Sequence, residues 1–309
     1  ILQITETQFT AKLLAGKICT FLYTKATIHD QDALHVGDEI AIRYIDAETG
    51  YEAKEIWVTM CAPSEEADIL AMLEQMSIEE KVGQMFFVRC PKEDAAEVLK
   101  RYAIGGCLLF ARDFKGKSAE QVRDTIAQYQ KHQKIPMFIG VDEEGGEVNR
   151  VSCYTALRNK PFLSPQELYQ EGGMDLIVTD TEEKADFLRL FGINVNFAPV
   201  CDVSVSPRDY MFKRTFGQNA KSTAEYVRAV VETMQRKGMG GILKHFPGYG
   251  NNANTHTGIA HDARPYTQFQ SEDFLPFEAG IDAGADCILV SHNIVVCMDV
   301  EKPASLSFK

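Results

Sequence analysis

Hydrophobic and polar positions follow two different periodicities along the chain. From residue 1 to about residue 63, short alternating or apolar runs are separated by turn residues, which is typical of a small mostly-β domain, either a barrel or a sandwich. The strand-like runs are residues 18–23, 39–44 and 55–60. One segment in this part, residues 7–15, is expected to form a short helix that ends at Gly16.

The pattern changes after residues 62–66, which are interpreted as a linker. Apolar runs then alternate with segments of helical spacing, and residues 77–80 form a capping box that opens a helix. The predicted strands are residues 84–89, 106–111, 136–142, 193–200, 241–244 and 286–291. The predicted helices are residues 67–75, 93–102, 119–133, 182–190 and 222–237. We therefore expect a small β-rich accessory domain over residues 1–63 and an α/β domain over residues 64–309.

Continuous apolar strands bounded by helices indicate parallel strands that are covered on both faces. Polar side chains recur at the carboxyl ends of these strands, at Arg89, Asp142, Asp202, Lys244–His245 and His292. In a (β/α)8 barrel the loops after those ends build the active site, whereas a doubly wound sheet concentrates its site at one switch point. The pattern therefore favours a (β/α)8 TIM-type barrel. It shows about six strands, so the C-terminal units of the barrel are expected to be missing from this chain.

Composition and charge argue against several functional classes. The 309 residues are 45% hydrophobic and 25% charged, which is ordinary for a globular protein. A formal net charge of -12 argues against a nucleic-acid or anionic-membrane partner, because either requires a basic face. No apolar run reaches the length of a membrane span. No secretory signal is visible, so we expect a cytoplasmic protein, with the reservation that the chain opens on Ile1 rather than Met.

The eight cysteines are scattered singly and form no C-x-x-C pair. Several stand in apolar runs, such as Cys107 before Leu108 and Cys287 before Ile288. We interpret them as buried free thiols of a protein from a reducing compartment. Their spacing argues against a zinc site, and we expect neither a metal nor a cofactor.

The densest group of candidate catalytic side chains is residues 244–258, which read K-H-F-P-G-Y-G-N-N-A-N-T-H-T-G. A strand delivers Lys244 and His245 into a loop that also holds Asn254 and His256. Such a loop has little apolar content to bury, so it lies at the surface or lines a cavity. Histidine is also the side chain whose unperturbed pKa lies nearest neutrality. Each residue taken singly is explained as well by a polar turn, but the whole run predicts an active-site loop.

Two further strand ends carry carboxylates. Residues 142–150 read D-E-E-G-G-E-V-N-R, a set that suits a metal, a sugar, a proton transfer or a turn with solvated acids. Arg150 is placed to donate a bidentate hydrogen bond to one of these acids. Residues 197–203 deliver Asp202 in the same way, and Arg214 stands just before a helix.

These motifs together resemble the N-terminal barrel domain of glycoside hydrolase family 3, and specifically its β-N-acetylglucosaminidase branch. They run in order from M-S-I-E-E-K-V-G-Q at residues 76–84 through D-E-E-G-G, A-P-V-C-D-V, R-T-F-G and K-H-F-P-G-Y-G to P-A-S-L-S at residues 303–307. The resemblance covers about residues 67–309, and K-H-F-P-G-x-G is its most specific motif.

Residues 17–40 more weakly resemble small β-barrels of the ASCH/PUA-like kind, some of which bind RNA. Residues 1–63 hold nine acidic and five basic residues, so an accessory packing module is favoured over RNA binding.

The family resemblance implies a role for each matching position. The implied substrate-binding residues are Asp142, Arg150, Asp202, Arg214, Lys244, His245 and His292. His256 would be the general acid/base, and a pKa near the working pH suits that role. A histidine also avoids the repulsion between two close carboxylates that the usual retaining pair must manage.

Two positions depart from the family pattern. The family has Asp-x-His before the acid/base, and here Asn254 stands at the Asp position. An amide holds the imidazole but does not balance its positive charge, and the comparable change in a serine-protease triad costs about four orders of magnitude in rate. Three explanations of Asn254 are open. It is the natural residue, its missing negative charge is compensated by another acid, or it is an engineered change that traps substrate. The family's nucleophile is an Asp on the strand after His292, beyond the end of this chain, and neither Asp202 nor Asp286 stands at that position.

We therefore predict a glycoside hydrolase that removes terminal β-linked N-acetylglucosamine by a retaining mechanism, from small glycosides or from oligosaccharides such as peptidoglycan fragments in cell-wall recycling. One alternative is a phosphorolytic β-N-acetylglucosaminidase, because a neutral histidine tolerates an incoming phosphate better than a carboxylate does. Another is a catalytically silent sugar-binding homologue, because of Asn254. A third, less favoured, makes residues 1–63 an RNA-binding module.

Overall fold

The structure is a computed structural model of the chain. It describes residues 3–4, 8–12, 18–22, 27–29, 39–47, 50–60, 72–131, 133–252 and 258–308. The chain forms two compact units, Ile1–Ser77 and Ile78–Lys309, and each is described by itself. The predicted domain boundary at residues 63 and 64 falls in a segment outside the described residues, so its position stays a prediction.

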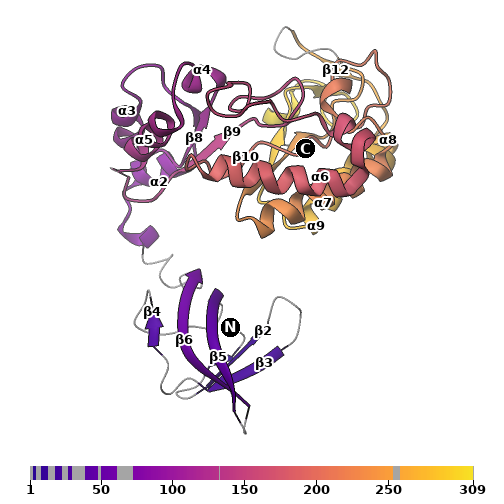
Figure 1. The fold of residues 1–309 in the computed structure, drawn as a ribbon. Coiled ribbons are helices and arrows are strands. Elements are labelled where there is room, and N and C mark those ends of the chain that lie inside the picture. Colours follow the sequence, from indigo (N-terminus) through magenta and orange to yellow (C-terminus); the bar gives the residue numbers. More distant parts are fainter. Residues whose placement is uncertain are drawn as a thin grey trace. The chain divides into compact units, whose positions relative to one another are not determined.

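The described residues of the first unit up to residue 60 form a β-sheet (Figure 1), and residues 72–75 are helical. The strands of this sheet are β1 (Gln3–Ile4), β2 (Gln8–Lys12), β3 (Ile18–Leu22), β4 (Thr27–His29), β5 (Glu39–Ala47) and β6 (Gly50–Met60). They are ordered β1-β2-β3-β6-β4, and β5 pairs with β6. The rings of Phe9 and Phe21, which stand opposite each other on β2 and β3, stack with their centroids 5.3 Å apart. The mostly-β character predicted for this part is confirmed.

The helix predicted over residues 7–15 is wrong, because β2 occupies Gln8–Lys12. Phe9 and Ala11 are both buried, at the two-residue spacing of a strand with one covered face. β2 also pairs antiparallel with β3 along its whole length. This pairing and the burial of alternate residues outweigh a weak local preference for helix.

The second unit is built on parallel strands whose order in space follows their order in the chain. They are β7 (Phe87–Arg89), β8 (Gly106–Leu109), β9 (Phe138–Val141), β10 (Val195–Asn196), β11 (Gly240–Phe246) and β13 (Cys287–Val290). Of these, β8, β9 and β10 are labelled in Figure 1. A doubly wound sheet reverses its strand order at a switch point, and these described strands show no reversal. The arrangement is TIM-like, as predicted.

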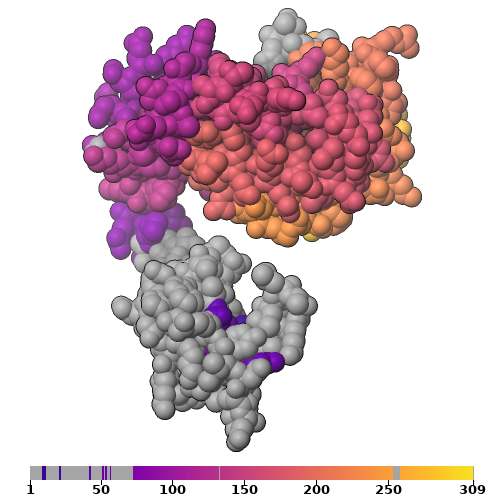
Figure 2. All heavy atoms as spheres, in the orientation of Figure 1, coloured from indigo at the N-terminus to yellow at the C-terminus, as the bar shows by residue number. Residues whose placement is uncertain are grey.

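Helices alternate with these strands. They are α2 (Ile78–Gln84), α3 (Ala95–Arg101), α4 (Ala111–Phe114), α5 (Ala119–Gln130), α6 (Pro165–Arg189), α7 (Ala220–Arg236), α8 (Tyr266–Gln268) and α9 (Phe274–Asp282). A parallel pair, β12 (His261–Asp262) with β14 (Ile294–Val295), lies outside the main sheet. In Figure 2 the pink-red atoms of the α6 region form much of the visible face of this unit. The main hydrophobic core lies between sheet and helices and includes Leu109, Val141, Leu188 and Leu243.

Some boundaries differ from the predicted ones. The helix predicted over residues 182–190 is the second half of α6, which begins after Ser164 in a capping box with Glu167. Gly173, with a φ of 65°, interrupts the helical geometry of α6. The apolar spacing is weak in the first half of α6, so this half was not predicted from the sequence. The strand predicted from residue 84 begins at Phe87 because Gln84 still belongs to α2. Residue 111 starts α4 instead of ending β8.

Side-chain alternation along the strands defines an inner face of the sheet, which faces the interior of the barrel. Leu108, Phe197 and Ile242 pack together on it. Phe87 meets Phe197 edge to face, with ring centroids 5.1 Å apart. Gly140 leaves space for both rings, since a Cβ there would lie 2.7 Å from each. Side chains two residues apart on a strand point to the same face. For β7, β8, β9 and β11, the residue two positions after the inner residue named above therefore shares this face and lies at the carboxyl edge.

Gly83 allows α2 to approach the segment between α3 and β8, where a Cβ would lie 2.1 Å from the carbonyl oxygen of Tyr102 and 2.7 Å from that of Ala103. Both atoms belong to the backbone, so Gly83→Ala is expected to lower the free energy of unfolding by about 1–3 kcal/mol through overpacking. Denaturant titration measures the change. The control is Val82→Ala in the same helix, where the side chain is 47% exposed. The control should stay within about 0.5 kcal/mol of wild type, and equal losses in the two variants would contradict the close approach.

Candidate functional site

Four side chains reach the carboxyl edge of the inner face. Each stands two positions beyond an inner residue of its strand, and they are Arg89, Phe110, Asp142 and Lys244. In barrels of this kind the carboxyl edge carries the active site. The site is therefore built outward from these positions.

Lys244 is the centre of the site. Its side chain is buried, with Nζ 2.7 Å from Asp142 Oδ1 and 2.5 Å from Glu144 Oε1. A buried ammonium is costly unless carboxylates pair with it. Both carboxylates come from the turn after β9, so the D-E-E run supplies two counter-charges from one loop.

Arg214 holds Glu144 through a bidentate contact. Its Nε lies 2.9 Å from Oε2 and its Nη2 lies 2.7 Å from Oε1 of Glu144. Burial alone would raise the pKa of Glu144, but attraction to Lys244 and the bonds from Arg214 outweigh it and lower the pKa to about 2. Glu144 is therefore ionised at neutral pH. We term Asp142, Glu144, Arg214 and Lys244 the charge quartet, in which two cations balance two carboxylates.

Glu143, between the two site carboxylates, has a different role. Its side chain is fully buried and accepts hydrogen bonds from the backbone amides of Arg150 and Val151 at 2.8 Å and of Ser152 at 3.1 Å. The hydroxyl of Ser152 donates to it as well. The hydrogen-bonding capacity of Glu143 is therefore used to close the loop over residues 143–152.

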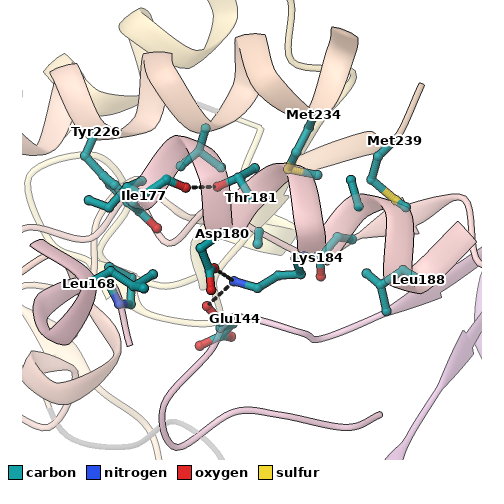
Figure 3. A pocket seen from close by; sticks show the side chains of 15 residues that line it. Glu144, Leu168, Ile177, Asp180, Thr181, Lys184, Leu188, Tyr226, Met234 and Met239 are labelled. Carbon is teal, nitrogen blue, oxygen red and sulfur yellow. Dashed lines mark hydrogen bonds and ion pairs between the residues drawn. The ribbon is translucent and has the colours of Figure 1, made fainter. Parts of the chain in front are cut away.

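A second buried ion pair lies behind Glu144 (Figure 3). Lys184 Nζ lies 3.1 Å from Asp180 Oδ2 and 3.3 Å from the carbonyl oxygen of Glu144. Lys184 and Asp180 are one turn apart on α6, and both are buried. A cavity of ≈ 20 Å³ beside them, lined also by Tyr226, has room for about one water molecule. The long helix α6 thus holds the backbone of Glu144 in place.

His245 bonds to Asp202, with Nδ1 2.7 Å from Oδ2. The other oxygen of Asp202 accepts a hydrogen bond from the backbone amide of Tyr249 at 2.7 Å. The register of β11 with β13 shifts between Lys244 and Phe246, which breaks the regular alternation and lets adjacent residues 244 and 245 both bond to carboxylates. A carboxylate at Nδ1 favours the tautomer that leaves Nε2 as the acceptor toward a ligand.

Arg264 organises a further buried cluster. It donates to Asp262 at 2.8–3.0 Å and to Asp273 at 2.7 Å. Asn252 donates to the same Asp262 at 2.8 Å. The chain on either side of residues 253–257 is therefore tied to one cluster of guanidinium and carboxylate groups.

The structure brings five of the predicted site residues into one connected region. Lys244 and His245 are neighbours on β11 and link the charge quartet to the second carboxylate pair. The five are Asp142, Asp202, Arg214, Lys244 and His245.

The other predicted residues that the structure describes are not part of this connected region. The guanidinium of Arg150 lies over the ring of Phe110, 5.9 Å from its centroid. His292 follows β13, and its Nδ1 bonds to Ser305 Oγ at 2.7 Å. The predicted catalytic residues 254 and 256 lie outside the described residues. The roles implied for all of these residues stay predictions.

Sequence reasoning did not single out Glu144 or the cluster around Arg264. The signal for Glu144 is its spacing of two residues from Asp142 at a strand end, which places both on one face. For the cluster around Arg264, the signal is the D-x-R spacing of Asp262 and Arg264. This signal is weaker because the third member, Asp273, comes from the next helical segment and is not marked by that spacing.

The described residues offer no group of three or more His, Cys, Asp or Glu side chains that could hold a metal ion. Nor is any helix among them long and apolar enough to cross a membrane. The site instead offers fixed donors and acceptors at the edge of a buried ion network. This chemistry suits a ligand with several hydroxyl groups.

Glu144→Gln is expected to lower the free energy of unfolding at neutral pH by about 3–5 kcal/mol, because it leaves two buried cations with one carboxylate. The control is Glu147→Gln in the same loop, whose ion pair with Lys213 is at the surface and whose side chain is 57% exposed. The control should cost about 0–1 kcal/mol. The folded pKa of Glu144, about 2, lies below its ordinary value of 4.5, so the stabilisation is present above pH 4.5 and lost as the pH falls toward 2. The free energies of unfolding of wild type and Glu144→Gln, measured by denaturant titration across this range, should therefore converge in acid. A difference that stays constant with pH would contradict the ion network.

Asp273 is expected to favour the folded state in acid. Burial raises the pKa of Asp273 to about 6, although Arg264 opposes the shift. The stabilisation of the folded state by protonated Asp273 is therefore fully present below pH 3.8, the ordinary pKa of the group, and is lost as the pH rises through about 6. The free energy of unfolding of Asp273→Asn should change less than that of wild type between about pH 4 and pH 7. A steeper change in the variant, measured by denaturant titration, would contradict the assignment.

Comparison with known proteins gives these features a family context. The sequence model of the "Glycosyl hydrolase family 3 N terminal domain" matches residues 77–309. A beta-hexosaminidase of Xanthomonas campestris pv. campestris (strain B100) is 36% identical over 199 residues, which are 63% of this chain and 59% of that protein. This chain therefore spans less than two thirds of the length of that relative.

Two solved structures show the same likeness. A glycoside hydrolase family 3 beta-N-acetylglucosaminidase from Paenibacillus sp. str. FPU-7 aligns with a TM-score of 0.67 and 25% identity, over 75% of this chain and 45% of that one. NagZ from Neisseria gonorrhoeae, in complex with N-trifluoroacetyl-D-glucosamine, aligns with a TM-score of 0.60 and 25% identity, over 70% of this chain and 64% of that one. Because the family model covers most of its length, the chain belongs to the glycosyl hydrolase family 3 N-terminal domain family, and it is similar to the NagZ-like branch of that family.

Proposed function

We propose that the full-length protein is a glycoside hydrolase that removes terminal β-linked N-acetylglucosamine by a retaining mechanism, with His256 as the general acid/base. The observation that carries the proposal is the charge quartet at the carboxyl edge of the barrel. Relatives described as beta-hexosaminidase and beta-N-acetylglucosaminidase support it.

The charge quartet would bind the hydroxyl groups of the sugar. Lys244 has three donors, of which two serve Asp142 and Glu144. The side chain of Asp142 keeps 17% of its surface exposed, so a hydroxyl can approach its carboxylate. Charge-assisted hydrogen bonds of this kind are stronger than neutral ones. Because each charge is already held by another, binding requires little rearrangement.

Asp202 supports this site indirectly. It is 1% exposed, and its two oxygens accept from His245 and from the amide of Tyr249. It orients the His245 ring so that Nε2 can accept a hydrogen bond from a sugar hydroxyl. Asp202 is therefore a positioning residue in this proposal.

A retaining mechanism also needs a carboxylate that attacks the anomeric carbon. Asp202 does not suit this role, because both of its oxygens are engaged. Asp286 precedes β13, at the opposite end of the strands from the site, and accepts from the amide of Gly241. We assign the nucleophile to neither residue.

Proton transfer is proposed to rest on His256. It would protonate the leaving oxygen in the first step and activate water in the second. Asn254 would orient its ring without balancing its charge, which limits the rate.

We further propose that the substrates include oligosaccharides such as peptidoglycan fragments, and that the protein acts in cell-wall recycling in the cytoplasm. The thiols of Cys90, Cys107 and Cys201 are free and buried, whereas those of Cys153, Cys287 and Cys297 are free and exposed, contrary to the burial predicted for Cys287. Free thiols support a reducing compartment. The net charge of -12 is unsuited to a nucleic-acid partner.

The full-length protein is expected to release the aryl alcohol from an aryl β-N-acetylglucosaminide, followed by absorbance. His256→Ala should lower kcat by about 10²–10⁴-fold, the usual contribution of a general acid/base. Asn254→Asp should raise kcat, because a carboxylate stabilises the imidazolium. His261→Ala, which alters an exposed histidine outside the loop, is the control and should retain the wild-type rate. Absence of turnover in both wild type and Asn254→Asp would refute the hydrolase.

A further inference from the structure

Two arginines outside the charge quartet share one aromatic ring. The guanidinium carbon of Arg89 lies 4.3 Å from the ring centroid of Phe110, and that of Arg150 lies 5.9 Å from the same centroid. Arg89 ends β7, Phe110 follows β8, and Arg150 comes from the loop after β9. Three neighbouring strands, or the segments that follow them, therefore contribute these three residues, and we term Arg89 and Arg150 the arginine pair.

The arginine pair lies on the same edge of the barrel as the proposed sugar site. Arg89 and Phe110 share the inner face with Asp142, because each stands two positions beyond an inner residue. β7 and β9 are two strand spacings apart, which is about 10 Å. A group attached to a sugar held at Asp142 is therefore within reach of Arg89.

Neither guanidinium is neutralised within the described part of the chain. Arg214 and Arg264 hold carboxylates at 2.7–2.8 Å, whereas the contacts of the arginine pair are with Phe110. The Nε of Arg150 is buried without a hydrogen-bond partner among the described residues. The neighbouring acid Glu143 already accepts three backbone amides. Arg89 and Arg150 are thus cations without a carboxylate partner among the described residues, in a chain whose net charge is -12.

We propose that Arg89 and Arg150 bind a negatively charged oxygen group, a carboxylate or a phosphate, on the aglycone side of the bound N-acetylglucosamine. This inference rests on the proposed function. A guanidinium fork suits bidentate binding of either anion. The ring of Phe110 holds both cations through cation–π contact, so less side-chain freedom is lost when the anion binds.

A pair of sulfur-linked glycosides, which resist hydrolysis, tests this site without turnover. One is phenyl 1-thio-β-N-acetylglucosaminide, and the other carries a carboxylate at the 4-position of the phenyl ring. Calorimetry on the full-length protein at low ionic strength gives Kd for both. The carboxylated ligand should bind about tenfold more tightly, as one added charge-assisted contact gives. In Arg89→Gln the ratio of the two Kd values should fall, and in the double variant Arg89→Gln/Arg150→Gln it should fall to about one.

Arg101→Gln is the matched control. Arg101 is also exposed and lies over an aromatic ring, 5.7 Å from the centroid of Tyr102, but it ends α3 at the other end of the strands. The control should keep the wild-type ratio. A wild-type ratio near one, or an equal loss in both variants, overturns the anion site and leaves the proposed function intact. If neither ligand binds, the proposed function fails and the anion site falls with it.

The source of the anion is decided by product analysis with an aryl β-N-acetylglucosaminide in phosphate buffer. If the site holds phosphate as a nucleophile, a phosphate oxygen bonds to the anomeric carbon, the aryl oxygen leaves with a proton, and N-acetylglucosamine 1-phosphate forms. Arg89→Gln should then weaken the dependence of the rate on phosphate. If the site holds an anionic aglycone, free N-acetylglucosamine forms and phosphate competes only with the carboxylated ligand. Either product supports the anion site when the Kd ratio is high.

Discussion

The need to pair one buried ammonium group shapes this site. Lys244 is 1% exposed, and an ammonium in such a place must be matched by carboxylates held at bonding distance. Asp142 and Glu144 meet this need from the strand on the far side of β10, which requires the parallel register of β9, β10 and β11. Glu144 in turn is held by Arg214 at its side chain and by Lys184 at its backbone carbonyl. The position of Glu144, and with it the geometry of the charge quartet, therefore depends on how α6 packs against the sheet.

The D-E-E run shows how a strand end can divide adjacent acids among separate tasks. Asp142 and Glu144 lie two residues apart and reach the same ammonium. Glu143, between them, instead accepts the amides that close the following loop. The loop therefore keeps its shape through one acid while the other two serve the charge quartet. The glycines that follow support the same turn, since Gly145 and Gly146 both have positive φ.

The strands, the barrel class and the positions of five site residues could be predicted from the sequence because each depends on local pattern. Apolar runs mark buried parallel strands, and the first polar residue after each run marks the carboxyl edge. The partner of each charge could not be predicted in this way, because Lys244 and Asp142 meet only through the order of the strands. The same limit explains why Arg150, which was expected to donate to one of the acids of the D-E-E run, lies over Phe110 instead, since a loop residue has no strand to direct it. The helix expected over residues 7–15 failed for a related reason, because pairing with β3 decides the structure of that segment.

The balance of charges within the quartet has a consequence for how a ligand arrives. Two cations and two carboxylates in contact produce only a weak field beyond their own neighbourhood, and salt screens what remains within about 10 Å. A neutral sugar would therefore be captured by direct contact, at a rate that ionic strength hardly changes. The large negative charge on the rest of the chain does not help this encounter. Recognition of such a ligand would rely on the fixed directions of a few hydrogen bonds, and long-range attraction would contribute little to it.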